Sequence, residues 1–171
     1  SRVSEDFYMY RNTLDAKGQR AYDQIMHDVC LQNLPVVFAI DRAGLVGSDG
    51  ETHQGIFDLS FLSTIPNMTI LAPKNKWELS DMMKFAVAFG APIAVRYPRG
   101  LAYDGLKEFR EPVVLGKSEM LYEESEVALF ALGGMVAIAE EVRNRLKERG
   151  HSCTLVNARF AKPFDEEMIR R

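Results

Sequence analysis

The chain has 171 residues, of which 47% are hydrophobic and 26% charged, an ordinary composition for a globular protein of one or two domains. Its formal net charge of −3 excludes a broadly basic surface, so we expect no nucleic-acid partner and no binding to a membrane surface. No apolar run approaches the roughly 20 residues that span a bilayer, and the polar, acidic start does not read as a signal peptide. These features predict a cytoplasmic protein.

The first hundred residues alternate helical patterns with near-continuous apolar runs. A helix is predicted from about Gln19 to Gln32, and a second from Trp77 to Val87, which Gly90 would end. Buried strands are predicted at 35–40, 69–72 and 92–97. Runs that are apolar throughout are typical of parallel strands covered on both faces. Strands that alternate with helices predict βαβ units and a parallel sheet.

A shift in composition from Gly100 to about Pro112 predicts a linker. A second α/β unit follows, with strands at 127–132 and 152–157, a helix at 135–149 and another helix opening after residue 163. The second domain therefore looks truncated, and we expect its apolar edges to favour self-association. Cys30 and Cys153 lie far apart in apolar segments, which predicts two buried structural thiols in a reducing compartment rather than metal ligands.

The densest polar segment, DRAGLVGSDGETHQG at 41–55, directly follows the first predicted strand. In an open α/β sheet, ligands bind beyond the carboxyl ends of the strands. Arg42 offers an anion binder, Asp49 a hydrogen-bond acceptor and His53 a titrating imidazole. By composition alone, a solvated connection is favoured somewhat over a site. It is not a P-loop, because no Lys-Ser or Lys-Thr follows its last glycine.

A second candidate, RYPRG at 96–100, follows the third predicted strand, and by the same rule it lies along the same edge of the sheet. An arginine here can bind a phosphate or a carboxylate through its planar fork, or it can simply close the strand at the surface. Arg20, at the start of the first helix, is a third candidate, with a surface salt bridge as its alternative role.

These segments resemble the 1-deoxy-D-xylulose-5-phosphate synthase family of thiamin-diphosphate enzymes. The resemblance rests on QRAYDQ at 19–24, LPVVFAIDRAGLVGSDGETHQGIFDLSFL at 34–62, IPNMTILAP at 65–73 and APIAVRYPRG at 91–100. Transketolase and the β subunits of 2-oxo acid dehydrogenases share the fold, but the combination of the DRAG segment with RYPRG points to the synthase.

The resemblance implies an α/β fold with a parallel sheet flanked by helices, as in the transketolase-like pyrimidine domain, plus a partial second α/β domain. Residues from about 113 are similar to the start of the transketolase-type C-terminal domain, with ARFAKP at 158–163 as a strand-to-helix turn. We therefore expect a non-matching segment at 1–17, an incomplete pyrimidine-binding domain at 18–112 and a truncated C-terminal domain at 113–171.

The resemblance also implies a transferase that condenses pyruvate with glyceraldehyde 3-phosphate, with loss of carbon dioxide, for isoprenoid, thiamin and pyridoxal phosphate synthesis. Thiamin diphosphate and Mg²⁺ would be the cofactors, and the enzyme would be a homodimer. Arg42 and Arg99 would hold the phosphate of the aldehyde, and His53 would be the catalytic residue that handles protons. Asp49 would orient hydroxyls or donors, and Arg20 would line the channel.

Two parts that the resemblance requires are missing from the chain. The glutamate that faces the aminopyrimidine of the cofactor would lie upstream of the first helix, and no GDG-type diphosphate and magnesium motif is present. We therefore expect this polypeptide alone to be inactive and a poor binder of thiamin diphosphate. Two alternatives stay open: a non-catalytic phosphate-binding remnant, or one subunit of a split thiamin-diphosphate enzyme.

Overall fold

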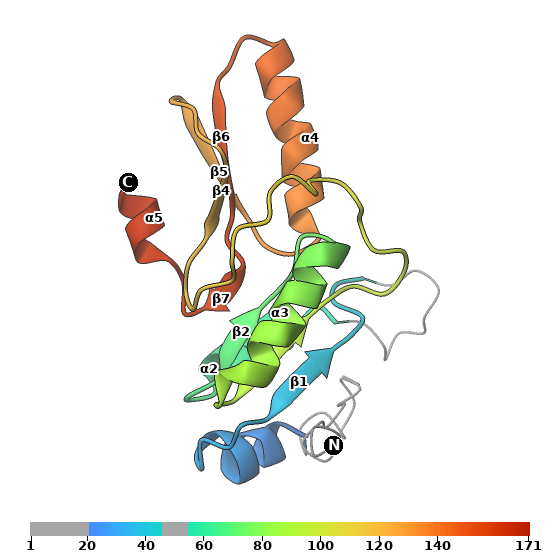
Figure 1. The fold of residues 1–171 in the computed structure, drawn as a ribbon, viewed down its shortest axis with the longest axis vertical. Helices are drawn as coiled ribbons and strands as arrows, with labels where there is room; N and C mark the ends of the chain where they lie inside the picture. Colours follow the sequence, from blue (N-terminus) through green and yellow to red (C-terminus); the bar gives the residue numbers. More distant parts are fainter. Residues whose placement is uncertain (1–20, 46–54) are drawn as a thin grey trace.

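The computed structural model describes residues 21–45 and 55–171, which form two stacked α/β units (Figure 1). The helices and strands, in chain order, are η1 (Ile25–Cys30, a π-helix), β1 (Val37–Ile40), α2 (Asp58–Thr64), β2 (Thr69–Leu71), α3 (Lys76–Phe89), β3 (Ile93–Arg96), β4 (Glu119–Tyr122), β5 (Val127–Ala131), α4 (Met135–Glu148), β6 (Cys153–Asn157), β7 (Phe160–Lys162) and α5 (Glu166–Arg170).

The first unit contains a four-stranded sheet with the order β1-β3-β2-β7. β3 pairs in parallel with β1 on one side and with β2 on the other, so that Ile93 lies opposite both Val37 and Thr69. The predicted α/β fold with a parallel sheet is therefore confirmed. Parallel neighbours bring the carboxyl ends of β1, β2 and β3 to one edge, which is the edge that matters for the site.

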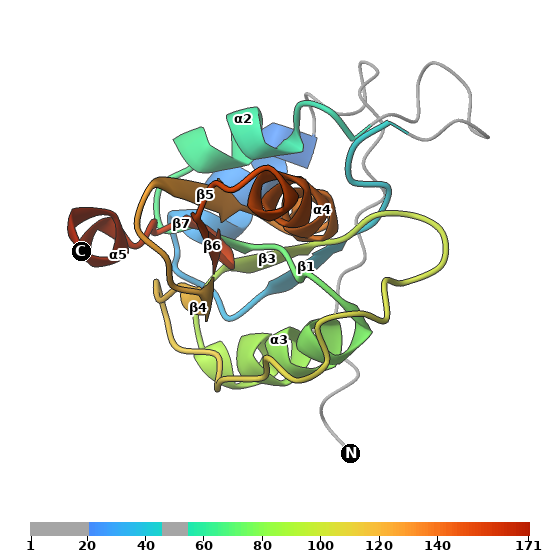
Figure 2. The same ribbon diagram turned by 90° about the horizontal axis from the view of Figure 1, so that it is seen from above.

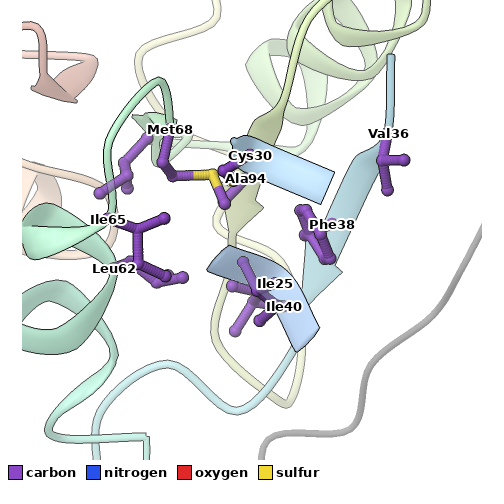
Figure 3. Packing of buried hydrophobic residues seen from close by; sticks show 10 residues of the cluster. Ile25, Cys30, Val36, Phe38, Ile40, Leu62, Ile65, Met68 and Ala94 are labelled. Carbon is purple, nitrogen blue, oxygen red and sulfur yellow. The ribbon is translucent and has the colours of Figure 1, made fainter. Parts of the chain in front are cut away.

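Helices cover both faces of this sheet, with α2 and η1 on one side and α3 on the other (Figure 2). Side chains of successive strand residues point to opposite faces, and the core divides accordingly. Phe38 and Ala94 pack with η1 and α2, whereas Val37 and Val95 pack with α3. Figure 3 shows the first of these clusters, formed by Ile25, Cys30, Val36, Phe38, Ile40, Leu62, Ile65, Met68, Ile70 and Ala94.

The second unit is a small mixed sheet with the order β4-β6-β5. β5 runs parallel to β6, whereas β4 runs antiparallel to it. The first turn of α4 packs on this sheet through Val136, which meets Leu121 and Leu155 in a separate core. Val127 and Phe130 on the outer strand β5 stay partly exposed. The prediction of a second, small α/β unit is confirmed.

One strand crosses from the second unit into the first. β7 leaves β6 and pairs antiparallel with β2, at the outer edge of the first sheet. Its Phe160 is fully buried against α3, where its ring meets that of Phe85 edge-on. The sequence patterns do not predict α2, β4 or β7. The domain boundary between residues 112 and 113 stays a prediction, because β7 belongs to the first sheet although it follows the second unit in the chain.

Both cysteines are buried and unpaired, as predicted for structural thiols. Burial raises the pKa of the Cys30 thiol to about 11, and burial also raises the pKa of Cys153. Neither thiol is therefore an activated nucleophile. Among the described residues, no helix is long and apolar enough to cross a membrane.

Candidate functional site

Backbone hydrogen bonds fasten the end of β1 to the end of β3 and hold two predicted site segments side by side. Tyr97 N–H donates to Ile40 O at 2.9 Å, and Ala43 N–H donates to Tyr97 O at 3.1 Å. Arg42 directly precedes Ala43, and Arg99 lies two residues after Tyr97. The described parts of both segments therefore lie at one edge of the sheet, as predicted, whereas the roles of Arg42 and Arg99 stay predictions.

Arg42 has an unusual backbone conformation. Its φ of 60° lies in the left-handed region, which costs a non-glycine residue about 1–2 kcal/mol. Such conformations cluster at ligand sites, where the surrounding structure holds them. Arg42 is partly exposed and Arg99 is exposed, so neither residue is enclosed in the core.

Shortly after Arg42 in the chain, Gly44 pairs with Gly55 through the backbone, and we call this pair of glycines the neck. Each glycine donates its N–H to the carbonyl of the other at 3.0 Å. A Cβ on Gly55 would lie 2.1 Å from the carbonyl oxygen of Arg42, so only glycine fits there. The two sides of the neck are therefore in direct contact, and Gly55 is packed on the backbone of Arg42.

The guanidinium of Arg96, on β3, binds the Gly55 side of the neck. Its Nη2 donates to Gly55 O at 2.8 Å, and its Nε donates to Asp58 Oδ2 at 2.8 Å. Asp58 opens α2 and is fully buried, whereas the Arg96 side chain is 16% exposed. Burial raises the pKa of Asp58 above its usual value, against the opposing hydrogen bond and charge of Arg96. One arginine thus ties the neck and α2 to β3.

A groove of about 830 Å³ opens between this edge and the second unit. It is lined by Ala43, Gly44, Leu45, Ile56, Leu59, Ala72, Arg96, Pro98, Leu129, Phe130, Ala131, Leu132, Gly133, Gly134, Met135, Ile138, Ala139 and Val142. Of these described lining residues, only Arg96 carries a charge. Because Asp58 already pairs with that charge, the lining is mainly apolar.

A buried polar cluster joins the two units, and we call it the interunit cluster. It consists of Lys74, Glu78, Glu119, Asn157 and Arg159, each no more than 3% exposed. Lys74 Nζ lies 2.5 Å from Glu119 Oε2 and 3.2 Å from Glu78 Oε1, and Arg159 also contacts both carboxylates, at 2.9 Å and 2.8 Å. Asn157 donates to the same two groups. Two cations therefore balance two carboxylates.

The electrostatics of Glu119 show how well this cluster is satisfied. Burial by itself would raise the pKa of Glu119, but hydrogen bonds from Lys74 and from the Glu111 N–H, with the charge of Arg159, outweigh it. The pKa of Glu119 is therefore lowered, and the carboxylate stays ionised although it is buried. Arg159 also donates to the carbonyls of Glu111 and Pro112, so the linker is held by the same cluster.

The predicted site residues divide into two groups. Arg42 and Arg99 lie at the sheet edge described above, within a few residues of the Ala43–Tyr97 hydrogen bond. Arg20, Asp49 and His53 lie outside the described residues, so their roles stay predictions. Asp58 is a residue of this edge that the sequence patterns do not predict. The sequence signal that could have indicated Asp58 is an acidic residue at the start of the helix after the loop, together with an arginine at a strand end.

Comparison with protein families identifies both units. A family model described as the pyrimidine-binding domain of transketolase matches residues 4–104. A second, described as the C-terminal domain of transketolase, matches residues 116–171. The chain belongs to the transketolase family. Among solved structures, a transketolase from Campylobacter jejuni covers 91% of this chain, and this chain covers 24% of it, with a TM-score of 0.74. At 24% identity that likeness supports the transketolase-like fold alone.

Within the transketolase family, the curated relatives include 1-deoxy-D-xylulose-5-phosphate synthases. That of Lachnoclostridium phytofermentans is 55% identical over 153 residues, which are 90% of this chain and 24% of the relative. That of Clostridium tetani is 54% identical over 153 residues, 90% of this chain and 25% of the relative. The chain is thus related to these synthases and spans about a quarter of their length.

Transketolase-family enzymes use thiamin diphosphate, and a divalent cation bound with its diphosphate would need oxygen ligands from the protein. In residues 21–45 and 55–171, no group of three or more His, Cys, Asp or Glu side chains could hold a metal ion. No described residue is therefore assigned to magnesium. What the sheet edge does offer is arginine, in Arg42 and Arg99, and this chemistry suits a phosphate or carboxylate.

Proposed function

We propose that the chain carries the acceptor-phosphate part of a 1-deoxy-D-xylulose-5-phosphate synthase active site. The complete enzyme would condense pyruvate with glyceraldehyde 3-phosphate and release carbon dioxide, supplying isoprenoid, thiamin and pyridoxal phosphate synthesis. The Ala43–Tyr97 hydrogen bond is the main support, because it brings the segments of Arg42 and Arg99 to one sheet edge. The 55% identity to a synthase adds to it.

Each site residue has a physical reason for its proposed role. Arg42 and Arg99 would offer two planar guanidinium forks to one phosphate dianion. His53 would be the catalytic residue near the reacting carbonyl, since an imidazole with an ordinary pKa of about 6.5 transfers protons well near neutral pH. Asp49 would orient hydroxyls of the acceptor, and Arg20 would line the channel.

Thiamin diphosphate and Mg²⁺ would be the cofactors of the complete enzyme. When bound, the cofactor supplies the carbanion chemistry on pyruvate, and the residues of this chain bind and orient the acceptor. Because the chain spans about a quarter of the length of these relatives, we expect a polypeptide of these residues to be inactive alone and to bind the cofactor weakly.

A chimaera tests the proposal directly. Residues 18–171 would replace the matching segment of the Lachnoclostridium phytofermentans synthase, and deoxyxylulose phosphate formation would be followed. We expect turnover, and we expect Arg42→Ala and Arg99→Ala each to raise KM for glyceraldehyde 3-phosphate about 10- to 100-fold, the worth of a hydrogen bond to a charged group. Unchanged KM in both variants, with an active chimaera, would contradict the phosphate role. Arg110→Ala, at an exposed pair with Asp81, is the control.

One solved structure favours a second candidate, a subunit of a split enzyme. A split-gene transketolase, solved as an inactive β4 tetramer, superposes with a TM-score of 0.76 at 28% identity. The likeness covers 88% of this chain and 48% of that one. On this reading a separate polypeptide would complete the site, and copurification of a stoichiometric partner that restores activity would favour it over the first.

Two further points separate the remaining alternatives. A non-catalytic remnant would bind glyceraldehyde 3-phosphate in a titration of the chain and lose that binding in Arg99→Ala, while its chimaera showed no turnover. Self-association is proposed because Val127 and Phe130 are partly exposed on the outer strand β5. Sedimentation of the purified chain would show a dimer if that strand edge is used.

A further inference from the structure

The contacts of Arg96 form a short relay to Arg42. Arg96 Nη2 holds the carbonyl of Gly55 at 2.8 Å, and Gly55 is packed on the carbonyl of Arg42. We propose that Arg96 is a positioning residue that fixes the backbone of Arg42 through Gly55. The inference rests on the proposed phosphate-binding role of Arg42. It gives Arg96 a part in the site that is distinct from that of Arg42 and Arg99.

The backbone of Arg42 requires support from outside its own segment. A φ of 60° is unfavourable for arginine and persists only where neighbouring structure imposes it. Two attachments are available, one to Arg96 at the end of β3 and one to Tyr97 directly after it. Ala43 is tied to Tyr97 by its N–H, and Gly55 is tied to Arg96 by its carbonyl. The Ala43–Tyr97 hydrogen bond holds the chain next to Gly44, and the Arg96–Gly55 hydrogen bond holds Gly55 itself.

Asp58 determines where the fork of Arg96 points. The Nε–Oδ2 hydrogen bond of 2.8 Å joins two charged groups, and such bonds are stronger than neutral ones. Asp58 is fully buried at the start of α2, and Leu62, one turn later, is fully buried in the core. The backbone of Asp58 is therefore anchored in the core, and its carboxylate holds the Arg96 guanidinium from that anchored helix.

An arginine is needed at this position because two acceptors on different elements must be reached at once. The planar guanidinium presents Nε and Nη2 along two fixed directions, one to Asp58 and the other to Gly55. A lysine ammonium is a point charge on a flexible stem and does not reproduce both contacts. Arg96→Lys should therefore keep a positive charge beside Asp58, and so keep the fold, while it releases the carbonyl of Gly55.

A purely structural role would give a different pattern. If the Arg96–Asp58 pair only fastened α2 to β3, Arg96→Lys would lower the stability of the whole chain evenly. The relay instead predicts a local change at the neck. Because Gly44 N–H and Gly55 N–H are both hydrogen-bonded across the neck, their exchange with solvent reports on it directly.

The test is amide hydrogen exchange followed by NMR on the purified chain and on Arg96→Lys. We expect exchange at Gly44 and Gly55 to become at least about tenfold faster, while Leu155 and Val156 in the second sheet keep their rates. Arg110→Lys is the matched control, because Arg110 also makes a two-pronged pair, with Asp81, at the exposed surface. It should leave the neck unchanged. Equal neck exchange in Arg96→Lys and the wild type would overturn the relay.

A titration with glyceraldehyde 3-phosphate separates this inference from the proposed function. We expect Arg96→Lys to bind it about tenfold more weakly than the wild type, as expected when a hydrogen bond to a charged group is misaligned. Faster neck exchange with unchanged affinity would overturn the positioning role. If the wild-type chain binds no glyceraldehyde 3-phosphate, the proposed function fails, and the exchange rates alone still decide whether Arg96 holds the neck.

Discussion

Arg159 Nε lies 2.8 Å from Glu78 Oε1, although 81 residues separate them in the chain. Glu78 is in the first turn of α3, in the first unit, and Arg159 lies between β6 and β7. Both are almost fully buried. Their contact is the centre of the interunit cluster, in which charges from both units neutralise each other away from water. Breaking one side of such a cluster leaves a buried charge unbalanced.

Glu78→Gln should therefore be strongly destabilising. The change leaves Lys74 and Arg159 with only one carboxylate, and we expect a loss of about 3–5 kcal/mol in the free energy of unfolding, measured in urea. Glu141→Gln is the control, because Glu141 pairs with Arg145 at the exposed surface of α4. It should change stability by less than about 1 kcal/mol. Similar losses in both variants would show that burial of the cluster does not matter.

Ionisation of Glu119 should contribute to the pH dependence of stability. Its pKa is lowered in the folded chain from an ordinary value of 4.5, so the folded state binds this proton more weakly than the unfolded state. The resulting stabilisation is complete above that ordinary value and is lost as pH falls through the folded pKa. We expect the free energy of unfolding, measured in urea, to fall steadily below about pH 4.5. In Glu119→Gln, the free energy of unfolding should fall less steeply as the pH is lowered. The same slope in the variant and the wild type would contradict the stabilising role of the Glu119 carboxylate.

Gly55→Ala should disturb the neck. A methyl group at Gly55 would meet the carbonyl oxygen of Arg42 at 2.1 Å, so the backbone must move. We expect a loss of about 2–3 kcal/mol in thermal or urea unfolding. Gly134→Ala is the matched control, because a Cβ there has nothing within 4 Å and its φ is −60°. That variant should be neutral or more stable by up to about 1 kcal/mol.

Phe160→Ala should weaken the attachment of β7 to the first unit. The ring is fully buried and meets Phe85 edge-on, with centroids 6.1 Å apart. Removing it leaves a cavity beside α3, and we expect a loss of about 3–5 kcal/mol in the free energy of unfolding. Phe164→Ala, at a ring that is 40% exposed, should cost about 1 kcal/mol or less. A small effect at Phe160 would mean that the core closes over the gap.

The elements that could be predicted from sequence are those with a local cause. β1, β2 and β3 are largely apolar because helices cover both faces, and the sequence predicts each to within two residues at either end. α3 ends at Gly90, where a φ of 75° suits glycine. The meeting of the Arg42 and Arg99 segments followed from the rule that parallel strands end at the same edge.

The remaining features depend on contacts between distant residues. β7 has three residues and forms because the edge of β2 is available to pair with it, which no local pattern reveals. The charges of the interunit cluster look like surface residues in the sequence, since their partners lie on other elements. The same reason hides Asp58, whose partner Arg96 is 38 residues away.

The path of β7 decides how the two units can be separated. A cut at the predicted boundary near Pro112 would leave the outer edge of β2 unpaired on the N-terminal piece. On the C-terminal piece, Phe160 would lose the side chains that bury it. Neither half would be a self-sufficient folding domain. The two units should therefore melt together in a single transition, whereas two bodies joined by a tether alone would melt in two.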